Sequence, residues 1–177
     1  MKSRGFTATR FMMAALIFTS CVGCDQITKH IAIANLQNEP PQSFFGDTLR
    51  FELAFNPGGF LSLGAALPDQ LRLGIFIAFN TTLLLGIITY LIARRPVPTT
   101  SFAPLLLILG GGVGNMIDRV WNDGLVTDFI NVGIGSVRTG VFNVADMAVM
   151  CGALVLLFVS SGHQRINDAE CGRGQES

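Results

Sequence analysis

The chain has 177 residues, of which 50% are apolar and only 14% are charged, whereas soluble domains carry roughly 25% charged residues. This composition excludes an ordinary water-facing domain and an intrinsically disordered chain, and it indicates a membrane protein. The 12 basic residues balance the 12 acidic ones and form no basic run, which excludes nucleic-acid binding.

Four apolar segments are suited to crossing ~30 Å of hydrocarbon as helices. No charged residue lies between Arg72 and Arg94, or between Arg95 and Asp118, and a further uncharged run follows Met147. The first apolar run, near the N-terminus, is shorter but continues into residues compatible with a helix. We therefore predict an α-helical membrane protein with four transmembrane helices, at about residues 9–33, 72–93, 100–120 and 142–161.

The first apolar segment allows a second interpretation. Lys2, Arg4 and Arg10 precede it, as in a cleavable signal peptide, and the run from Cys21 to Cys24 resembles a lipobox, the site where lipoproteins are modified. However, Cys21 stands where a lipobox has leucine, and a lipoprotein would not carry three further spans. We expect the segment to remain as a membrane anchor.

The distribution of charge predicts the orientation of the helices. With the N-terminus inside, seven Lys and Arg residues lie inside and five outside, and nine of the twelve acids lie at or beyond the outer helix ends. We predict that both termini face the cytoplasm (N-in/C-in). Residues 1–162 then form a single domain, about 38–70 form a β-containing periplasmic segment, and 163–177 form a polar cytoplasmic tail without regular structure.

The two outer connections contain patterns typical of strands. Residues 49–55 alternate apolar and polar side chains, which predicts a half-buried strand. The sequence 56–59 reads as a turn, and 60–63 is expected to pair back as the second strand. Val126–Ile130 is another short strand-like run. These patterns predict a small extracytoplasmic β-sheet at the outer surface of the membrane.

Four acids, Asp25, Asp118, Asp128 and Asp146, fall near the same depth at the outer ends of the spans. Ionisable groups within spans cost about 2.5–3.5 kcal/mol each on insertion scales, so they are functional candidates. Asp25 has a structural interpretation, because Lys29 lies one turn away and can pair with it.

The third span combines polar residues with small ones. Asn115 shares a helix face with Asp118 and Arg119, directly after a run of glycines. Glycines allow close helix packing in membranes. The polar triplet suits either a supporting network or direct chemistry, and Arg119 can also bind an anionic or carbonyl group of a ligand.

Asp128 and Asp146 differ from the other acids because neither has a basic residue at helical spacing. Asn143 can hydrogen-bond Asp146 at the start of the fourth helix, and stabilisation of that helix end is one interpretation. The other is a pair with Asp128. Two carboxylates in a low-dielectric site share a proton, the arrangement used by aspartic peptidases.

Other chemistries have less support. His30 and His163 lie on opposite sides of the predicted membrane, and no zinc-peptidase motif occurs. Nothing brings Lys29 to Ser62 as a Ser/Lys pair, and the cysteines favour packing over metal or redox work. A proton- or cation-relay transporter and a non-catalytic scaffold whose acids only hold helices together stay open as alternatives.

Five short motifs in chain order resemble those of the bacterial lipoprotein signal peptidases, also called signal peptidase II. They are D-Q-x-T-K at 25–29, N-x-G at 56–58, G-G-x-x-G-N-x-x-D-R at 110–119, V-x-D-F at 126–129 and F-N-x-A-D at 142–146. Each motif alone is weak, whereas five in order on four spans are specific. The chain departs from the family after residue 58, where Ala-Ala-Phe-Gly is usual and residues 59–64 read G-F-L-S-L-G.

The resemblance implies an intramembrane aspartic peptidase of the bacterial inner membrane. It implies cleavage of diacylglyceryl-modified prolipoproteins before the lipidated cysteine, with the β-sheet over an active site near the periplasmic face. It places the catalytic pair on Asp128 and Asp146 and the structural pair on Asp25 and Lys29. Residues that bind substrate or support the site are then Asn56, Gly58, Asn115, Asp118, Arg119 and Asn143.

The resemblance also sets the expected ligands. It implies sensitivity to the cyclic peptide globomycin and no metal or organic cofactor. The expected partners are the lipoprotein substrate and membrane lipid, and we expect a monomer.

Overall fold

Helices make up most of the computed structural model, which describes residues 8–58, 68–94 and 97–173. The helices are α1 (Ala8–Leu36), α2 (Asp69–Ala93), α3 (Thr99–Trp121) and α4 (Val144–Arg173). The first three coincide with the predicted spans to within three residues at each end. Each is long and apolar enough to cross a membrane, whereas the apolar part of α4, Val144–Val159, is shorter.

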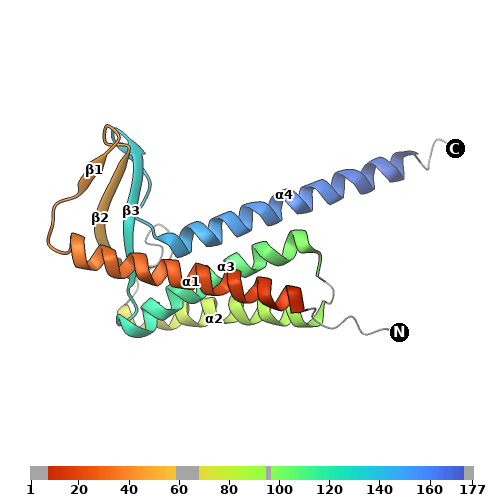
Figure 1. The fold of residues 1–177 in the computed structure, drawn as a ribbon, viewed down its shortest axis with the longest axis horizontal. Coiled ribbons are helices and arrows are strands. Elements are labelled where there is room, and N and C mark those ends of the chain that lie inside the picture. The colour runs from red at the N-terminus through yellow and green to blue at the C-terminus, as the bar shows by residue number, and fades with distance from the viewer. Residues whose placement is uncertain (1–7, 59–67, 95–96, 174–177) are drawn as a thin grey trace.

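Helix α3 is the centre of the bundle, since it packs against each of the other three helices (Figure 1). Glycines make this packing close. A Cβ atom at Gly111 would collide with the carbonyl oxygen of Ala145 on α4, and one at Gly114 would lie 2.6 Å from the Asp25 carboxylate on α1. The glycine run therefore serves helix packing, as the sequence predicted.

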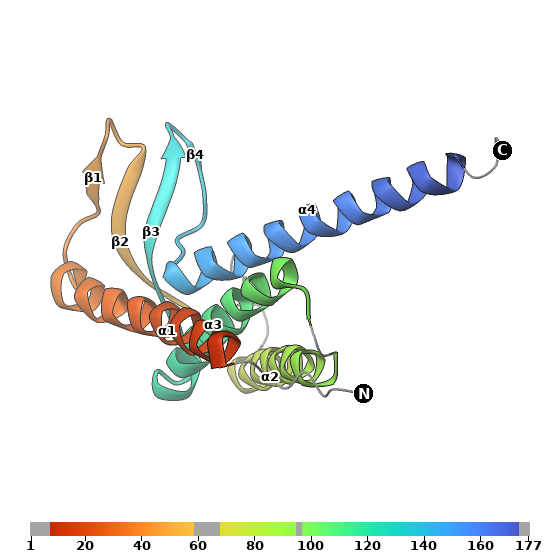
Figure 2. The same ribbon diagram turned by 45° about the vertical axis from the view of Figure 1, so that its right-hand side comes forward.

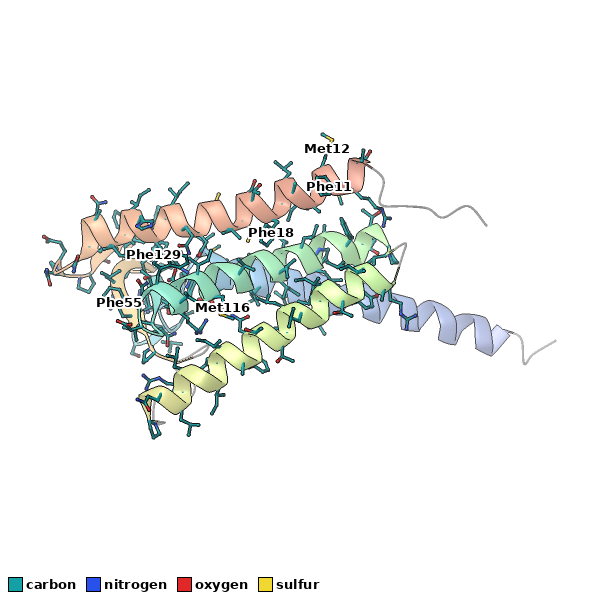
Figure 3. The ribbon with its side chains drawn as sticks, turned by 90° about the horizontal axis from the view of Figure 1, so that it is seen from below. Phe11, Met12, Phe18, Phe55, Met116 and Phe129 are labelled. Carbon is teal, nitrogen blue, oxygen red and sulfur yellow. The ribbon has the colours of Figure 1, made fainter. Side chains whose placement is uncertain are left out.

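The outer surface of the helices is apolar. Phe11 is 66% exposed, Phe79 67% and Phe158 75%. Met12 projects from α1 away from the other helices (Figure 3). Exposed apolar side chains on this scale indicate a surface that faces lipid.

A four-stranded antiparallel sheet stands across one end of the helices (Figures 1 and 2). Its strands, in spatial order, are β1 (Gln42–Phe44), β2 (Leu49–Asn56), β3 (Val126–Ile134) and β4 (Val137–Arg138). The predicted strands at 49–55 and 126–130 are confirmed. The strand expected at 60–63 lies outside the described residues. Among the described residues β2 pairs with β1 and β3, and this register places Ala54 opposite Asp128 and Asn56 opposite Val126.

The prediction of an irregular tail is wrong for most of its length. Helix α4 continues past residue 162 to Arg173. The segment 163–173 contains no proline, and polar residues such as Gln, Arg and Glu are good helix formers, so the helix has no reason to stop where its apolar residues end.

Candidate functional site

Asp128 and Asp146 reach one cavity, although they come from different elements. Asp128 lies on β3, and Asp146 lies in the first turn of α4. The cavity has a volume of about 780 Å³. Both acids line it together with four other residues singled out from the sequence: Asn56, Gly58, Asn115 and Arg119.

Asn143 connects the two acids. Its backbone N–H donates to Asp146 Oδ2 at 3.2 Å, and the Asp146 N–H donates to Asn143 Oδ1 at 2.9 Å, which is a reciprocal cap at the start of α4. Because Oδ1 accepts this bond, Nδ2 is directed at Asp128, and it donates to Oδ1 of that carboxylate at 2.6 Å. The helix-capping interpretation of Asp146 is confirmed, and the same contact joins it to Asp128.

The other two carboxylate oxygens of the pair also accept amide hydrogens. Asn56 Nδ2 donates to Asp128 Oδ2 at 3.0 Å, while Asn56 Oδ1 accepts from the Gly58 N–H at 2.9 Å. Asn115 Nδ2 donates to Asp146 Oδ1 at 2.8 Å. All four oxygens thus face neutral donors, and none of the ion pairs formed within the described ranges involves either acid.

Burial changes the acidity of Asp128, which is 1% exposed. Loss of hydration raises the pKa of this carboxyl to about 7, and the negative charge of Asp146 acts in the same direction. The hydrogen bonds from Asn56 and Asn143 lower the pKa and offset part of the effect. A carboxyl with such a pKa exchanges a proton near neutral pH.

The other two acids form a separate buried cluster with a lysine. Lys29 Nζ lies 2.8 Å from Asp25 Oδ2 and 3.1 Å from Asp118 Oδ2. Gln26 Nε2 reaches both acids, at 3.1 Å and 3.0 Å. The predicted Asp25–Lys29 pair is confirmed, and the cluster also includes Asp118 from α3. Sequence reasoning missed Gln26, although its place inside the 25–29 motif was a signal.

This cluster holds the backbone next to each acid of the pair. Asp118 Oδ2 accepts the Thr127 N–H at 2.8 Å, and Asp25 Oδ1 accepts the Ala145 N–H at 2.9 Å. Those two N–H groups belong to the residues directly before Asp128 and Asp146. The cluster therefore fixes the start of β3 and the start of α4 relative to α1 and α3.

Lys29 also sets the direction of one amide. It donates to Asn115 Oδ1 at 3.0 Å, and an ammonium group has no acceptor. Asn115 must therefore turn its Nδ2 group towards Asp146, where the 2.8 Å bond forms. The polar triplet of the third span is divided: Asp118 belongs to the support, and Asn115 touches the site.

Arg119 lines the same cavity as the pair and bonds to backbone carbonyls rather than to Asp118. Its Nη2 donates to the Gly58 carbonyl at 3.1 Å and its Nη1 to the Asn115 carbonyl at 3.2 Å. The guanidinium lies 5.7 Å from the centre of the Phe76 ring. Its Nε is buried and has no hydrogen-bond partner among the described residues.

The rest of the cavity is apolar and follows α4 away from Asp146. Its helix residues recur at helical spacing and were not singled out from the sequence, although their 3–4 periodicity after Asp146 was a usable signal. Cys151, one of the cysteines expected from the sequence to serve packing, is exposed and lines this cavity. The α4 residues that line it are Met147, Met150, Cys151, Leu154, Val155 and Phe158.

The remaining candidates fall away from the site. Cys21 is buried against Gly110, and His30 is exposed on α1. Ser62, considered with Lys29, lies outside the described residues. Within the described ranges, no group of His, Cys, Asp and Glu side chains has the arrangement needed to hold a metal ion.

Comparison with known proteins decides the family. The family model described as signal peptidase (SPase) II matches residues 17–161. The chain belongs to the signal peptidase II family. Its members are peptidases, and the pair of acids, the amides around it and the lysine cluster all lie inside the matched range.

Individual relatives agree with this assignment. The chain is 35% identical over 159 residues to a lipoprotein signal peptidase of Francisella tularensis subsp. novicida, covering 85% of this chain and 89% of the relative. It is 34% identical over 164 residues to a lipoprotein signal peptidase of Chlorobium phaeobacteroides, covering 85% of this chain and 89% of that relative. A lipoprotein signal peptidase of Streptomyces griseus is 31% identical over 140 residues, and the chain covers 65% of its length.

Solved structures show the same fold. A bacterial membrane enzyme determined by the in meso method superimposes with a TM-score of 0.76 at 22% identity, covering 85% of this chain and 88% of that one. A second bacterial membrane enzyme superimposes with a TM-score of 0.74 at 23% identity, covering 90% of this chain and 96% of that one. The long apolar helices and the small sheet of this chain therefore have the same fold as these two proteins.

Proposed function

We propose that this chain is an intramembrane aspartic endopeptidase that removes the signal peptide from diacylglyceryl-modified prolipoproteins by cleaving before the lipidated cysteine. The observation that carries the proposal is the pairing of Asp128 and Asp146 in one cavity, with every carboxylate oxygen held by a neutral amide donor. The relatives named lipoprotein signal peptidase supply the substrate class.

In the proposed reaction, water held between the two carboxylates attacks the scissile carbonyl. One acid accepts the proton from water and the other donates a proton to the departing nitrogen, which contributes roughly 10²- to 10⁴-fold. The pair titrates as a unit, so the proton belongs to both acids. The raised pKa of Asp128, about 7, supports a shared proton near neutral pH.

Donors around the pair would stabilise the charge that develops on the carbonyl oxygen. Arg119 is the candidate, because it lines the cavity beside both acids, whereas Asn143 is fully buried and its donors hold the two carboxylates. Asn56 and Asn115 orient the carboxylates, Gly58 brings the backbone close to Arg119, and Asp118 supports the strand before Asp128.

The apolar part of the cavity suits the remainder of the substrate. A lipidated substrate keeps its acyl chains and its signal peptide in the bilayer, and its polar domain outside. The apolar face of α4 that continues from Asp146 to Phe158 offers these parts a path beside the scissile bond. No metal or organic cofactor takes part in this proposal.

The proposed setting is the bacterial inner membrane. We propose four spans with both termini in the cytoplasm, a site near the periplasmic face, residues 1–162 as one peptidase domain and a monomeric enzyme. Globomycin, as a substrate-like cyclic peptide, is proposed to occupy the same cavity.

The test is cleavage by the purified full chain in lipid vesicles. A prolipoprotein carrying the diacylglyceryl group is compared with the same protein left unmodified, and the products are identified by mass spectrometry. The proposal expects a cut directly before the lipidated cysteine, no cut of the unmodified protein, and inhibition by globomycin. Equal cleavage of both substrates, or none of either, would contradict it.

A further inference from the structure

The four-stranded sheet has an apolar face on the side of the cavity. Residues paired across strands share a face, as do alternate residues along one strand. Val132 and Ile134 on β3 are thus on the face that carries Asp128, and Val132 lines the cavity itself. The strand register extends this face to three more apolar residues: Phe44, Leu49 and Val137.

The opposite face is polar and tied together. Ser43, Arg50 and Asn131 form one row across three strands. Two side chains donate to the Asp47 carboxylate. Ser43 Oγ does so at 2.7 Å, and Arg50 Nη2 does so at 2.5 Å. Arg138 donates to Asn131 and to the Asp47 carbonyl oxygen, the latter at 2.7 Å. The sheet is therefore amphipathic, and hydrogen bonds link its strands on the polar side.

Among residues 8–58, 68–94 and 97–173, few side chains cover the outer half of the apolar face. Ile134 is 81% exposed and Val137 79%, while Phe44 is 43% exposed. Exposed apolar patches mark surfaces that bind protein or membrane. This patch is continuous with a surface that faces lipid, because Val132 lines the same cavity as Met150 of α4, which is 47% exposed.

We propose that this apolar face, defined by Phe44, Leu49, Val132, Ile134 and Val137, rests on the hydrocarbon boundary of the outer leaflet and sets the depth of Asp128. The sheet stands across the helix ends (Figures 1 and 2), so a bilayer crossed by the helices runs along the sheet. Its polar face then points to water. Since Asp128 lies on the same strand as Val132 and Ile134, seating the strand fixes the height of the carboxylate.

The inference rests on the proposed membrane orientation, but its test needs no turnover. Trp121 is the only tryptophan in the sequence, so Trp121→Phe gives a silent background. Into it we place Ile134→Trp or Val137→Trp on the apolar face, and Ser43→Trp, which is exposed on the polar face, as the matched control. The full-length proteins are reconstituted in phosphatidylethanolamine–phosphatidylglycerol vesicles with lipids brominated on their acyl chains.

We expect bromine to quench Trp at 134 and 137 several-fold more than Trp at 43. Equal quenching of both faces, or no quenching at 134 and 137, would overturn the proposal. Blue-shifted Trp emission without quenching would also overturn it, because it would show that protein rather than lipid covers this face. A failure of peptidase activity leaves this readout unchanged, so the two proposals fail separately.

The effect on depth has its own test. The double change Ile134→Ser with Val137→Ser alters two exposed side chains outside the catalytic machinery. We expect cleavage of the lipidated substrate to fall several-fold in vesicles and to stay unchanged in detergent micelles, where no leaflet fixes the depth. An unchanged rate in vesicles would overturn the depth-setting role.

Discussion

Two groups of acids lie at the same end of the helices and differ in how their charge is balanced. Asp25 and Asp118 share the ammonium group of Lys29, at 2.8 and 3.1 Å. Asp128 and Asp146 contact only amide donors within the described parts of the chain. The ammonium group balances the charge of the first two carboxylates, whereas two carboxylates without a cation compete for a proton. The first arrangement suits structural support, and the second suits proton transfer.

The two groups are nevertheless connected. The ionic group binds the backbone N–H directly before each acid of the pair, and Lys29 directs the Asn115 amide at Asp146. The ionic group thus forms a frame around the pair that we propose to be catalytic. Changing the frame should cost stability, and changing the pair should cost activity.

The largest stability effect is expected from Lys29→Met. The substitution leaves Asp25 and Asp118 buried without their cation, and breaking a buried ion pair costs about 3–5 kcal/mol. Thermal unfolding in detergent should show a large fall in the midpoint. A midpoint equal to that of the wild type would show that the cluster does not hold the frame.

A smaller effect is expected where the two groups meet. Asn115→Ala removes the donor to Asp146 Oδ1 and the acceptor for Lys29. We expect kcat to fall by roughly 10- to 100-fold, as for loss of a group that orients a functional side chain, with KM little changed. Steady-state kinetics on the lipidated substrate provide the measurement. A rise in KM at constant kcat would instead assign Asn115 to substrate binding.

The helix contact beneath the ionic group can be tested with a matched pair of glycines. A Cβ at Gly114 would lie 2.6 Å from Asp25 Oδ2, whereas a Cβ at Gly86 has no neighbour within 4 Å. Gly114→Ala should therefore destabilise by about 1–3 kcal/mol, and Gly86→Ala should not destabilise. Equal unfolding midpoints for the two variants would contradict this packing.

The pH dependence is the mildest test. The pKa of Asp128 is about 7, so the shared proton is lost as pH rises through 7 and kcat should fall on the alkaline side. Because this pKa is raised above the ordinary ~3.9, the folded state binds the extra proton between about pH 4 and 7, and stability should decline across that window. A rate that increases from pH 7 to 9 would contradict the assignment.

Much of this arrangement could be predicted from the sequence. Apolar runs located α1 to α3 to within three residues, and alternation located β2, because both signals are local; a short strand-like run located β3. Spacing along one helix also predicted the Asp25–Lys29 pair and the Asn143–Asp146 cap.

Contacts between distant segments could not be predicted in this way. Pairing of β2 with β3 brings Asn56 to Asp128 across 72 residues, and no local pattern encodes that register. Arg119 was expected to share a network with Asp118, but its guanidinium turns to Gly58 instead. The direction of the Asn115 amide depends on Lys29 from another helix, so only the folded bundle shows it.

The most direct measurement is cleavage of a diacylglyceryl-modified prolipoprotein by purified Asp128→Asn and Asp146→Asn, with thermal unfolding recorded for the same samples. We predict that each variant loses about 10²- to 10⁴-fold in rate while its unfolding midpoint falls much less than that of Lys29→Met, because removal of a buried charge offsets the one amide hydrogen bond that is lost. Wild-type cleavage by either folded variant would contradict the catalytic role of the pair.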